Sequence, residues 1–359
     1  MEAHKHAHVP GSCHCCFIIP PHVIKKLSKE AKSEADRDRL FETLRLTENL
    51  RGQRFALRSL LSQPQQQTGE LSRTVYDAHH STRLPGKLVR SEGQAAVSDA
   101  TVNAAYDNVG STYTFYREQF DRNSVDVRGL RLDSTVHYAR QFDNAFWNGQ
   151  QMVYGDGHQF HDFAAALDVI GHELTHGVTQ YQVPPDGLDY HDQPGALNES
   201  WSDVFGSMIK QWAQKPQQTV TKADWLIGAT IVPAGWKALR SMKEPGTAFD
   251  GDPQPADMQH YAQMDDDEGG VHINSGIPNR AFYLACYNLS PNGFSWEKAG
   301  KVWYGAYRFL KHDSSFTDAA NATSHAAQLL YGKNSAEQKA VEDAWKQVGV
   351  KASAEVMVG

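Results

Sequence analysis

Apolar residues recur at helical spacing over the first part of the chain. They fall every three or four residues, at Val23, Ile24, Leu27 and Ala31, then Leu40, Phe41 and Leu44, then Leu57, Leu60 and Leu61. This pattern predicts helices from residue 23 to about residue 61. The segment SQPQQQTGE that follows, residues 62–70, is rich in Gln and contains Pro and Gly, which predicts a linker.

The pattern changes between residues 71 and 148, where β-branched and aromatic residues mix with turn formers. The strand-like stretches are RTVYDA, KLVR, STVHYARQF and QMVYGDG, and LPG and WNG are typical of turns. Within this region Val102, Ala105, Tyr106 and Val109 recur at helical spacing, which predicts one helix over residues 98–119. We therefore predict a β-rich lobe over residues 71–165 that carries one early helix.

Helical patterns dominate from about residue 160 to the end. In the last one, Val341, Ala344, Trp345 and Val348 form a single apolar stripe. Ser335 and Gln338 resemble a capping box before it, and Gly349 stands where a C-terminal cap is expected. The prediction is a helical lobe over residues 166–350 and, for the whole body, an α+β fold.

Charge separates the beginning of the chain from the rest. The 359 residues carry a net charge of −7, which argues against a nucleic-acid partner. Residues 1–61, however, hold 11 Lys and Arg against 7 Asp and Glu, so the remainder carries −11. A basic helical piece joined by a linker to an acidic body suggests a pro-segment that docks on its own enzyme. A solvated helical extension is the alternative that charge alone leaves open.

The N-terminal sixteen residues hold three of the four cysteines, Cys13, Cys15 and Cys16, among several histidines. Such a tail can bind a soft metal, or it can be a flexible polar tail. The apolar run that ends at Ile19 is too short for a signal peptide, and no run is long enough to cross a bilayer. We expect cytoplasmic synthesis, secretion by a non-classical route and no membrane partner.

The motif HELTH, residues 172–176, carries the first candidate chemistry. On a helix His172 and His176 project from one face, so both imidazoles can reach one metal ion, with Glu173 at its flank. In a chain with 17 histidines the motif can also arise by chance. The apolar spacing of the surrounding residues, ALDVIGHELTHGV, favours a buried helix.

A catalytic zinc takes three protein ligands and leaves one position open for water. The candidate third ligand is Glu199 in GALNESWSDVFG, four residues before Asp203 on the same helical face. Asp203 would then accept a hydrogen bond from the non-ligating nitrogen of His172. The alternative is that both carboxylates lie on a solvated face, but the apolar residues around them predict a half-buried helix.

HELTH with NESWSD downstream resembles the thermolysin family of neutral metallopeptidases. DNAFWNGQQMVYGDG, KALRSM and DDDEGGVHINSGIPN agree, and the similarity covers residues 73–349. The short helical leader with IIPP is similar to the protealysin-like branch. The resemblance implies a two-lobed body with a zinc site between the lobes. It also implies a zinc endopeptidase made as a proenzyme, with residues 1–61 as an inhibitory pro-segment, and we expect a monomer.

The resemblance also implies roles for single residues. His172, His176 and Glu199 would hold the zinc, and Glu173 would be the general base. His272 and Tyr190 would stabilise the oxyanion, with Asp267 orienting His272. Asn144 and the backbone of Ala145 would pair with an extended substrate, and Arg240 would hold the carbonyl after the cut.

The pocket for the residue just after the cut would be apolar, which predicts a preference for bulky hydrophobic residues. Its expected lining is Leu239, Val169, Ile227, Phe160 and Phe163, all of which can equally be plain core. Relatives carry a calcium pair that Asp168 and Asp224 match here. Lys210, Leu226 and Ala229 replace three of its acidic ligands, and Lys237 replaces one of a further calcium site. We therefore predict zinc without the calcium pair, and Lys210 in a salt bridge with the two aspartates.

The leader supplies the last predictions. Its strand Phe17–Val23 would pack on the body, a cysteine among 13, 15 and 16 can reach the zinc as a thiolate, and self-cleavage is expected between residues 50 and 69. The rival function is a non-catalytic zinc-binding protein, which predicts the loss of Glu173 or His272, yet both are present. A purely structural zinc site would take four protein ligands, and the sequence offers three.

Overall fold

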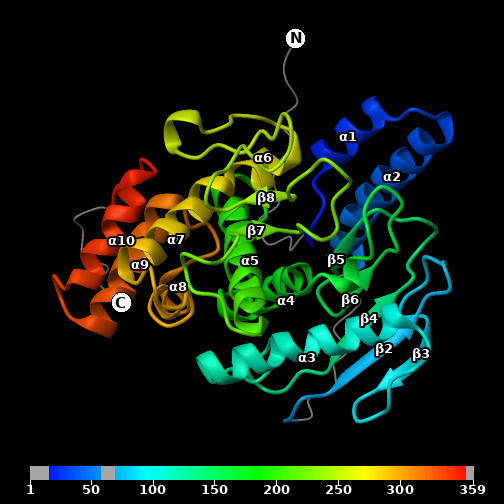
Figure 1. Cartoon of the computed structure of the whole chain (residues 1–359), viewed down its shortest axis with the longest axis horizontal. Helices are drawn as coiled ribbons and strands as arrows, with labels where there is room; N and C mark the ends of the chain where they lie inside the picture. Colours follow the sequence, from blue (N-terminus) through cyan, green and yellow to red (C-terminus); the bar gives the residue numbers. More distant parts are fainter. Residues whose placement is uncertain (1–15, 58–68, 353–359) are drawn as a thin grey trace.

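The protein, described by a computed structural model over residues 16–57 and 69–352, places a small N-terminal segment against a two-part body (Figure 1). The N-terminal elements are β1 (Cys16–Phe17), α1 (Pro21–Glu30) and α2 (Glu34–Leu57). The strands of the body's first part are β2 (Arg73–Asp77), β3 (Lys87–Ser91), β4 (Leu132–Val136), β5 (Ala145–Trp147) and β6 (Met152–Tyr154). Helix α3 (Ala100–Phe120) interrupts them, as its apolar spacing predicts.

These strands form one mixed sheet in the order β1-β5-β6-β4-β2-β3. The β2–β4 and β4–β6 pairs are parallel, and the other pairs are antiparallel. Helix α3 packs against β2 and β4 and begins at Asp99, whose side chain accepts from the backbone N–H groups of Thr101 and Val102. The sheet therefore ends, on the side of β5, in a strand that the N-terminal segment supplies.

The second part of the body is helical. Its main helices are α4 (Leu167–Gln182), α5 (Asp192–Ala213), α6 (Asp267–Asn274), α7 (Gly276–Leu289), α8 (Ala299–Ala306), α9 (Phe316–Tyr331) and α10 (Ala336–Gln347). A small hairpin, β7 (Leu226–Ile227) with β8 (Arg240–Ser241), and the short 3-10 turns η1 (Phe163–Ala165), η2 (Met258–His260) and η3 (Tyr307–Phe309) complete it. Figure 1 shows α4 and α5 in the middle, between the sheet and the group α7–α10. None of the helices in the described ranges has the length and apolar content needed to span a membrane.

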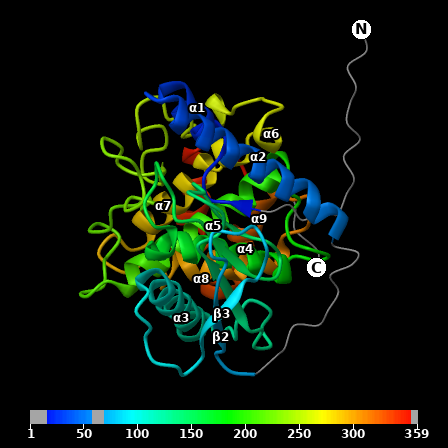
Figure 2. The ribbon, with the colours of Figure 1, turned by 90° about the vertical axis from the view of Figure 1, so that its right-hand side faces the viewer.

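The N-terminal segment docks on the body through its apolar residues. Phe17, Ile18 and Ile19 are each at most 1% exposed, and Val23 and Ile24 of α1 are equally buried. Figure 2 shows α1 and α2 lying along one side of the body, with the dark blue strand β1 reaching toward its centre. The predicted packing of residues 17–23 on the body therefore holds, but the predicted strand is wrong in extent: β1 covers only Cys16–Phe17, and the chain turns helical at Pro21.

One predicted region lies outside the described residues, and one predicted detail differs in the structure. The helical pattern after residue 57 and the linker up to residue 68 lie outside the described residues. At α10 only half of the predicted capping box forms: Ser335 Oγ accepts from the N–H of Gln338, but the Gln338 side chain accepts from Asn334 instead of returning to Ser335. A complete box forms one helix earlier, at Ser315 before α9. Gly349 adopts the expected positive φ, 82°.

Candidate active site and metal centre

The HELTH motif lies on α4, with its functional side chains turned into the protein. His172 and Glu173 are fully buried, and His176 is 3% exposed. Because the two histidines are four residues apart on the helix, their rings meet, and the Nε2 atoms are 3.0 Å apart. Two imidazole nitrogens at this distance, shielded from water, need a cation or a proton between them.

Helix α5 supplies the carboxylate that faces this pair. Glu199 Oε2 lies 3.4 Å from His172 Nε2, and its Oε1 lies 3.4 Å from His176 Nε2. Glu199 is fully buried, and its Oε2 has no hydrogen-bond partner among the described residues. We call His172, His176 and Glu199 the HELTH cluster; the structure brings these three predicted metal ligands together.

The outer nitrogen of each imidazole is held by a partner on α5. His172 Nδ1 is 2.8 Å from Asp203 Oδ1, whereas His176 Nδ1 is 2.8 Å from Asn198 Oδ1 and 3.0 Å from Ser202 Oγ. When the Nδ1 atoms carry the protons, the Nε2 lone pairs face the centre of the cluster. In zinc sites, hydrogen bonds to the outer nitrogen orient the imidazole ring in this way.

The charges around the cluster are balanced by further buried groups. Arg240 makes a two-pronged ion pair with Asp203, at 2.8 and 2.7 Å, and Asn279 donates to the same carboxylate at 2.8 Å. Burial opposes ionisation of Asp203, but Arg240 and His172 outweigh it and hold the pKa of Asp203 well below its usual range.

The pKa values of the two imidazoles are shifted in opposite directions. Burial lowers the pKa of His176 to about 3. At His172 burial acts in the same direction, but the hydrogen bond with Asp203 and the nearby Glu199 carboxylate raise its pKa to about 9. One imidazole thus favours its neutral form and the other its charged form, so the cluster accommodates positive charge at its centre.

These observations fit a zinc ion. Two imidazoles with fixed outer nitrogens and a carboxylate with an unsatisfied, buried oxygen form the His2Glu donor set of catalytic zinc sites. A carboxylate oxygen left without a partner at zero exposure is costly unless a cation meets it.

Glu173 lies beside the cluster without belonging to it. Its Oε2 accepts from the backbone N–H of Trp147 at 2.9 Å, while its buried Oε1 has no partner among the described residues. Burial raises the pKa of Glu173 well above its ordinary value. A carboxylate with one anchored oxygen, one available oxygen and a raised pKa suits a general base.

The remaining polar groups of the site come from α6 and the segment before α5. His272 Nδ1 is 2.7 Å from Asp267 Oδ1, and the charges of Asp267 and Glu199 raise the pKa of His272 against the effect of its burial. Tyr190 donates a short hydrogen bond to Glu199 and lies 3.3 Å from His272 Nε2. The turn before His272 depends on Gly269, at φ 83°, where a Cβ atom would lie 2.1 Å from the Asp192 carboxylate.

The N-terminal segment contacts the residues beside these groups. Asn144 Oδ1 accepts from the Ile19 N–H at 2.9 Å, and Asn144 Nδ2 donates to the Ile19 carbonyl at 3.1 Å. Ile18 donates its N–H to the Ala145 carbonyl at 3.1 Å, and Arg240 donates to the Ile18 carbonyl at 3.2 Å. The residues predicted to hold an extended substrate therefore hold the leader.

The predicted pocket residues are all buried, with Leu239 and Phe160 at 3% and the others fully enclosed. They belong to the main hydrophobic cluster of the body, which runs from Ile18 to Val350 and does not by itself separate pocket lining from core: Val169, Ile227, Leu239, Phe160 and Phe163. Leu239 and Ile227 are joined through their backbone in the β7–β8 hairpin, at 2.9 Å.

Lys210 forms a separate cluster at the predicted calcium position. Its ammonium lies 3.2 Å from Asp168, 3.0 Å from Asp224 and 2.5 Å from the Leu226 carbonyl. Burial lowers the pKa of Lys210, but the two aspartates outweigh it and raise the pKa.

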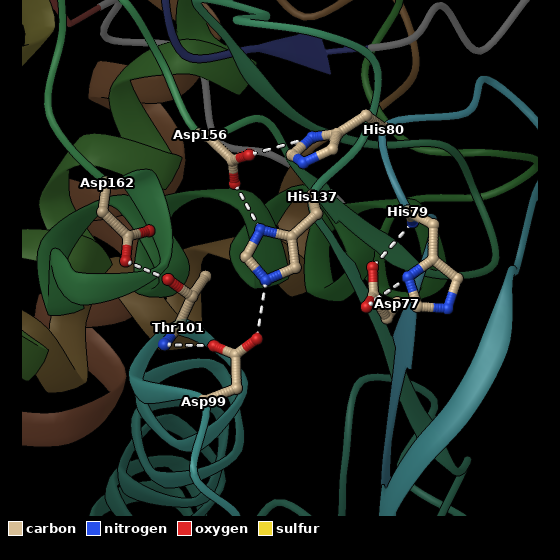
Figure 3. A pocket seen from close by; sticks show the side chains of 8 residues that line it. All are labelled: Asp77, His79, His80, Asp99, Thr101, His137, Asp156 and Asp162. Atoms are coloured by element: carbon tan, nitrogen blue, oxygen red, sulfur yellow. Dashed lines mark hydrogen bonds and ion pairs between the residues drawn. The ribbon is translucent and has the colours of Figure 1, made fainter.

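A second group of histidines and carboxylates lines a surface pocket in the β-rich part (Figure 3). His137 Nδ1 lies 2.6 Å from Asp156, and its Nε2 lies 2.9 Å from Asp99, the cap of α3. His80 lies 3.3 Å from the other oxygen of Asp156. We call Asp99, His137, Asp156 and His80 the His137 cluster. The hydrogen bond with Asp156 is the largest of the effects that raise the pKa of His137 to about 9.

Comparisons with known proteins agree with this geometry. The family profile "Thermolysin metallopeptidase, catalytic domain" matches residues 38–180, and "Thermolysin metallopeptidase, alpha-helical domain" matches residues 186–350. The chain is 44% identical to an extracellular metalloprotease of Pectobacterium carotovorum subsp. carotovorum, over 95% of this chain and 98% of that protein. It is 40% identical to the protease PrtS of Photorhabdus sp. (strain Az29), over 94% and 93%.

A solved structure, the precursor of protealysin from Serratia proteamaculans, superposes with a TM-score of 0.82 at 45% identity, covering 93% of this chain and 99% of that one. The fold and the site thus define a metallopeptidase with a cleft between an α/β lobe and a helical lobe. The chain belongs to the thermolysin family. It is a zinc-dependent metalloendopeptidase, and with its leader in the cleft it has the form of a proenzyme.

Several residues of the site escaped the sequence analysis. Asn198 and Ser202 at His176, the backbone of Trp147 at Glu173, and Asn279 at Asp203 were not assigned partners. Arg240 was expected to bind a substrate carbonyl but not to neutralise Asp203. Only Asn198 and Ser202 carried a signal, since their spacing of four residues places them on one helical face.

Proposed function

We propose that the HELTH cluster holds the catalytic zinc and that Glu173 is the general base of peptide hydrolysis. The observation that carries this proposal is the convergence of His172, His176 and the unsatisfied Glu199 carboxylate next to the unpartnered oxygen of Glu173. Zinc, when bound, supplies a Lewis acid and makes a water molecule acidic near neutral pH.

The chain's own groups perform the proton transfers and position the substrate. Glu173 takes a proton from the attacking water and delivers it to the leaving nitrogen. His272, which already donates to the Phe17 carbonyl at 2.9 Å, stabilises the developing negative charge on the carbonyl oxygen, and Tyr190 assists. Asp267 orients His272 and favours its charged form. Asp203 fixes the ring of His172.

The leader indicates how substrates bind. Asn144 and Ala145 pair with an extended peptide, and Arg240 holds the carbonyl of the residue after the cut, as they do for Ile18 and Ile19. Val169, Ile227 and Leu239 are buried apolar residues of the main hydrophobic cluster, and this expected apolar lining favours bulky apolar residues just after the cut. Phe160 and Phe163 contribute to the same cluster.

We also propose that the fold does not need the calcium pair. Lys210 supplies between Asp168 and Asp224 the positive charge that a cation would bring, and calcium sites need six to eight oxygens. Residues 1–61 are proposed as the pro-segment and residues 62–70 as the linker. Residues 71–165 and 166–350 are then the two lobes.

The protein is proposed to act outside the cell as a monomer, without nucleic-acid or membrane partners. The similarity to the extracellular metalloprotease of Pectobacterium carotovorum supports the location. Maturation by self-cleavage is proposed within residues 50–69, most of which lie outside the described residues.

The test compares the full chain with Glu173→Gln on a protein substrate, with and without a zinc chelator. Glu173→Gln should lower kcat by about 10²–10⁴-fold while keeping one zinc per chain, because the carboxylate is proposed to transfer protons and not to bind metal. The matched control is Glu297→Gln, a glutamate outside the site. Retained activity in Glu173→Gln, or its loss together with the zinc, would contradict the assignment.

A further inference from the structure

We infer that Cys16 is a zinc ligand in the proenzyme and that it protects a leader peptide bond which the protein otherwise presents as a substrate. The inference rests on the proposed zinc site. It concerns the latent form of the protein and assigns a role to one particular cysteine.

The first observation is the position of the Cys16 side chain. Cys16 is 2% exposed and forms a small buried cluster with Tyr190 and Val271, both next to the zinc site. Its Sγ, a ligand nitrogen of His176 and a ligand oxygen of Glu199 all lie within 4.8 Å of one another. Cys16 thus joins two members of the HELTH cluster in a group of potential ligand atoms. Thiolate is a strong zinc ligand and completes a closed, four-ligand site.

The second observation is independent of the cysteine. Glu199 Oε2 is fully buried without a hydrogen-bond partner among the described residues, and the two imidazole Nε2 atoms face each other at 3.0 Å. These atoms require a cation at the point that the Cys16 side chain approaches. A buried ion with a thiolate in its fourth position has no place left for the attacking water.

The third observation is the register of the leader. Strand β1 pairs antiparallel with β5, with Cys16 opposite Trp147 and Phe17 opposite Phe146. Trp147 is also the residue whose N–H anchors Glu173. The leader therefore runs past the proposed general base as an added strand of the sheet.

This register places one peptide bond at the position of a bond to be cut. The Phe17 carbonyl accepts from His272 at 2.9 Å, the proposed oxyanion donor. On the other side of the bond, the Ile18 carbonyl accepts from Arg240 at 3.2 Å, the proposed holder of the carbonyl after the cut. The Phe17–Ile18 bond thus lies between the groups that would flank a scissile bond.

Hydrolysis of this bond would consume one water and leave a carboxylate on Phe17 and an amine on Ile18. The thiol of Cys16 prevents it by filling the position that water needs. Loss of the thiol should therefore turn the leader from an inhibitor into a substrate.

The ligand claim is tested by loading the full-length Glu173→Gln chain with cobalt, which keeps the leader attached. A sulfur-to-cobalt charge-transfer band is expected in the near ultraviolet. The band should persist in Cys15→Ser, the neighbouring control, and disappear in both Cys16→Ser and Cys16→Ala. Thermal unfolding of each variant shows that the fold is retained, and agreement of the two Cys16 variants guards against a defect of either one.

The protection claim is tested in chains with Glu173 intact. Zinc is added to metal-free precursors, and intact mass spectrometry follows the release of the fragment 1–17. Cys16→Ser should release it at least tenfold faster than Cys15→Ser. The rate should not change on dilution, because the bond is cut within its own chain. Equal release in the two variants would overturn the protection claim.

The possible outcomes distinguish a failure of the Cys16 inference from a failure of the proposed zinc peptidase function. A cobalt spectrum unaffected by Cys16→Ser, in a protein whose parent cleaves protein substrates, overturns the thiolate ligand and leaves the peptidase assignment standing. Failure of every variant to bind cobalt or zinc overturns both.

Discussion

The HELTH cluster and the His137 cluster contain the same kinds of side chain and behave in opposite ways. In the HELTH cluster the inner nitrogens of His172 and His176 face each other, and the Glu199 carboxylate keeps one oxygen without a partner. In the His137 cluster both nitrogens of one ring point at carboxylates, Asp99 and Asp156. Within the described part of the chain, the first cluster keeps a buried carboxylate oxygen without a partner beside two facing nitrogens, whereas in the second each ring nitrogen of His137 has a carboxylate partner.

The difference shows that histidine and carboxylate content alone does not identify a metal site. Both ring nitrogens of His137 are directed at carboxylates, so the protonated ring presents no lone pair to an ion. At the Lys210 cluster, the lysine ammonium likewise supplies the positive charge that the carboxylates of Asp168 and Asp224 need. Burial, and the atoms left unsatisfied by it, separate a site that needs an ion from one that does not.

The largest expected effect is that of His176→Ala. Zinc content should fall from about one ion per chain to nearly none, and peptidase activity should fall at least about a thousandfold, since the metal contributes several kcal/mol to catalysis. Zinc analysis of dialysed protein and a protein-substrate assay measure both. The companion variant His137→Gln should keep its zinc and, at pH 7, its activity within about twofold. If His137→Gln loses zinc as well, the contrast between the clusters is wrong.

Asp203→Asn should be the next most damaging change. It removes the charge that compensates buried Arg240, which we expect to lower the free energy of unfolding by about 3–5 kcal/mol. It also weakens the hold on His172, so zinc affinity should fall about 10–100-fold. Urea unfolding and titration against a competing chelator measure the two effects.

The matched control for Asp203→Asn is Asp224→Asn, which removes a carboxylate whose side chain is 46% exposed. We expect a change of about 1 kcal/mol or less there, because water screens the pair with Lys210. Similar losses in the two variants would show that burial does not set the cost.

Lys210→Glu should convert an internally neutralised site into one that needs an external cation. With Asp168 buried and its ammonium partner gone, we expect a loss of about 2–3 kcal/mol of stability in calcium-free buffer. Calcium should restore part of the loss in this variant, whereas the parent should not change its melting temperature, with zinc kept saturating throughout. A parent protein that is clearly stabilised by calcium would contradict the proposed role of Lys210.

The smallest effect concerns pH and His137. Because the folded-state pKa, about 9, lies above the unfolded value of 6.5, the imidazolium stabilises the fold fully below pH 6.5. That contribution is lost as the pH rises from 6.5 through 9. After allowance for solvent screening at this partly exposed ring, we expect about 1–2 kcal/mol. Urea unfolding at pH 6 and pH 9.5 should show this loss of unfolding free energy in the parent and a smaller loss in His137→Gln. If the substitution leaves the pH dependence of the unfolding free energy unchanged, His137 does not cause it.

The sequence predicts those parts of the molecule that depend on local spacing. The i, i+4 spacing within HELTH and between Glu199 and Asp203 predicts which side chains share a face, and helix α3 follows from its apolar stripe. The resemblance to a family adds His272, Tyr190 and Arg240, whose environments no local pattern reveals.

The remainder depends on contacts between segments far apart in the chain. Arg240 contacts Asp203, 37 residues away in the sequence, and Ile18, 222 residues away, and no periodic pattern predicts contacts at these sequence separations. The choice of Cys16 among three neighbouring cysteines follows only from the register of β1 on β5. At α10, the competition of Asn334 for the Gln338 side chain is a rotamer choice that a motif does not specify.

The position of β1 has a further consequence for the enzyme after the leader departs. Removal of β1 makes β5, Ala145–Trp147, the outermost strand of the sheet, with its backbone groups exposed. An exposed edge invites unwanted pairing between molecules, and proteins limit this hazard by keeping such edges short. Three residues offer a passing polypeptide enough backbone to align for cutting, yet too little to nucleate a growing aggregate.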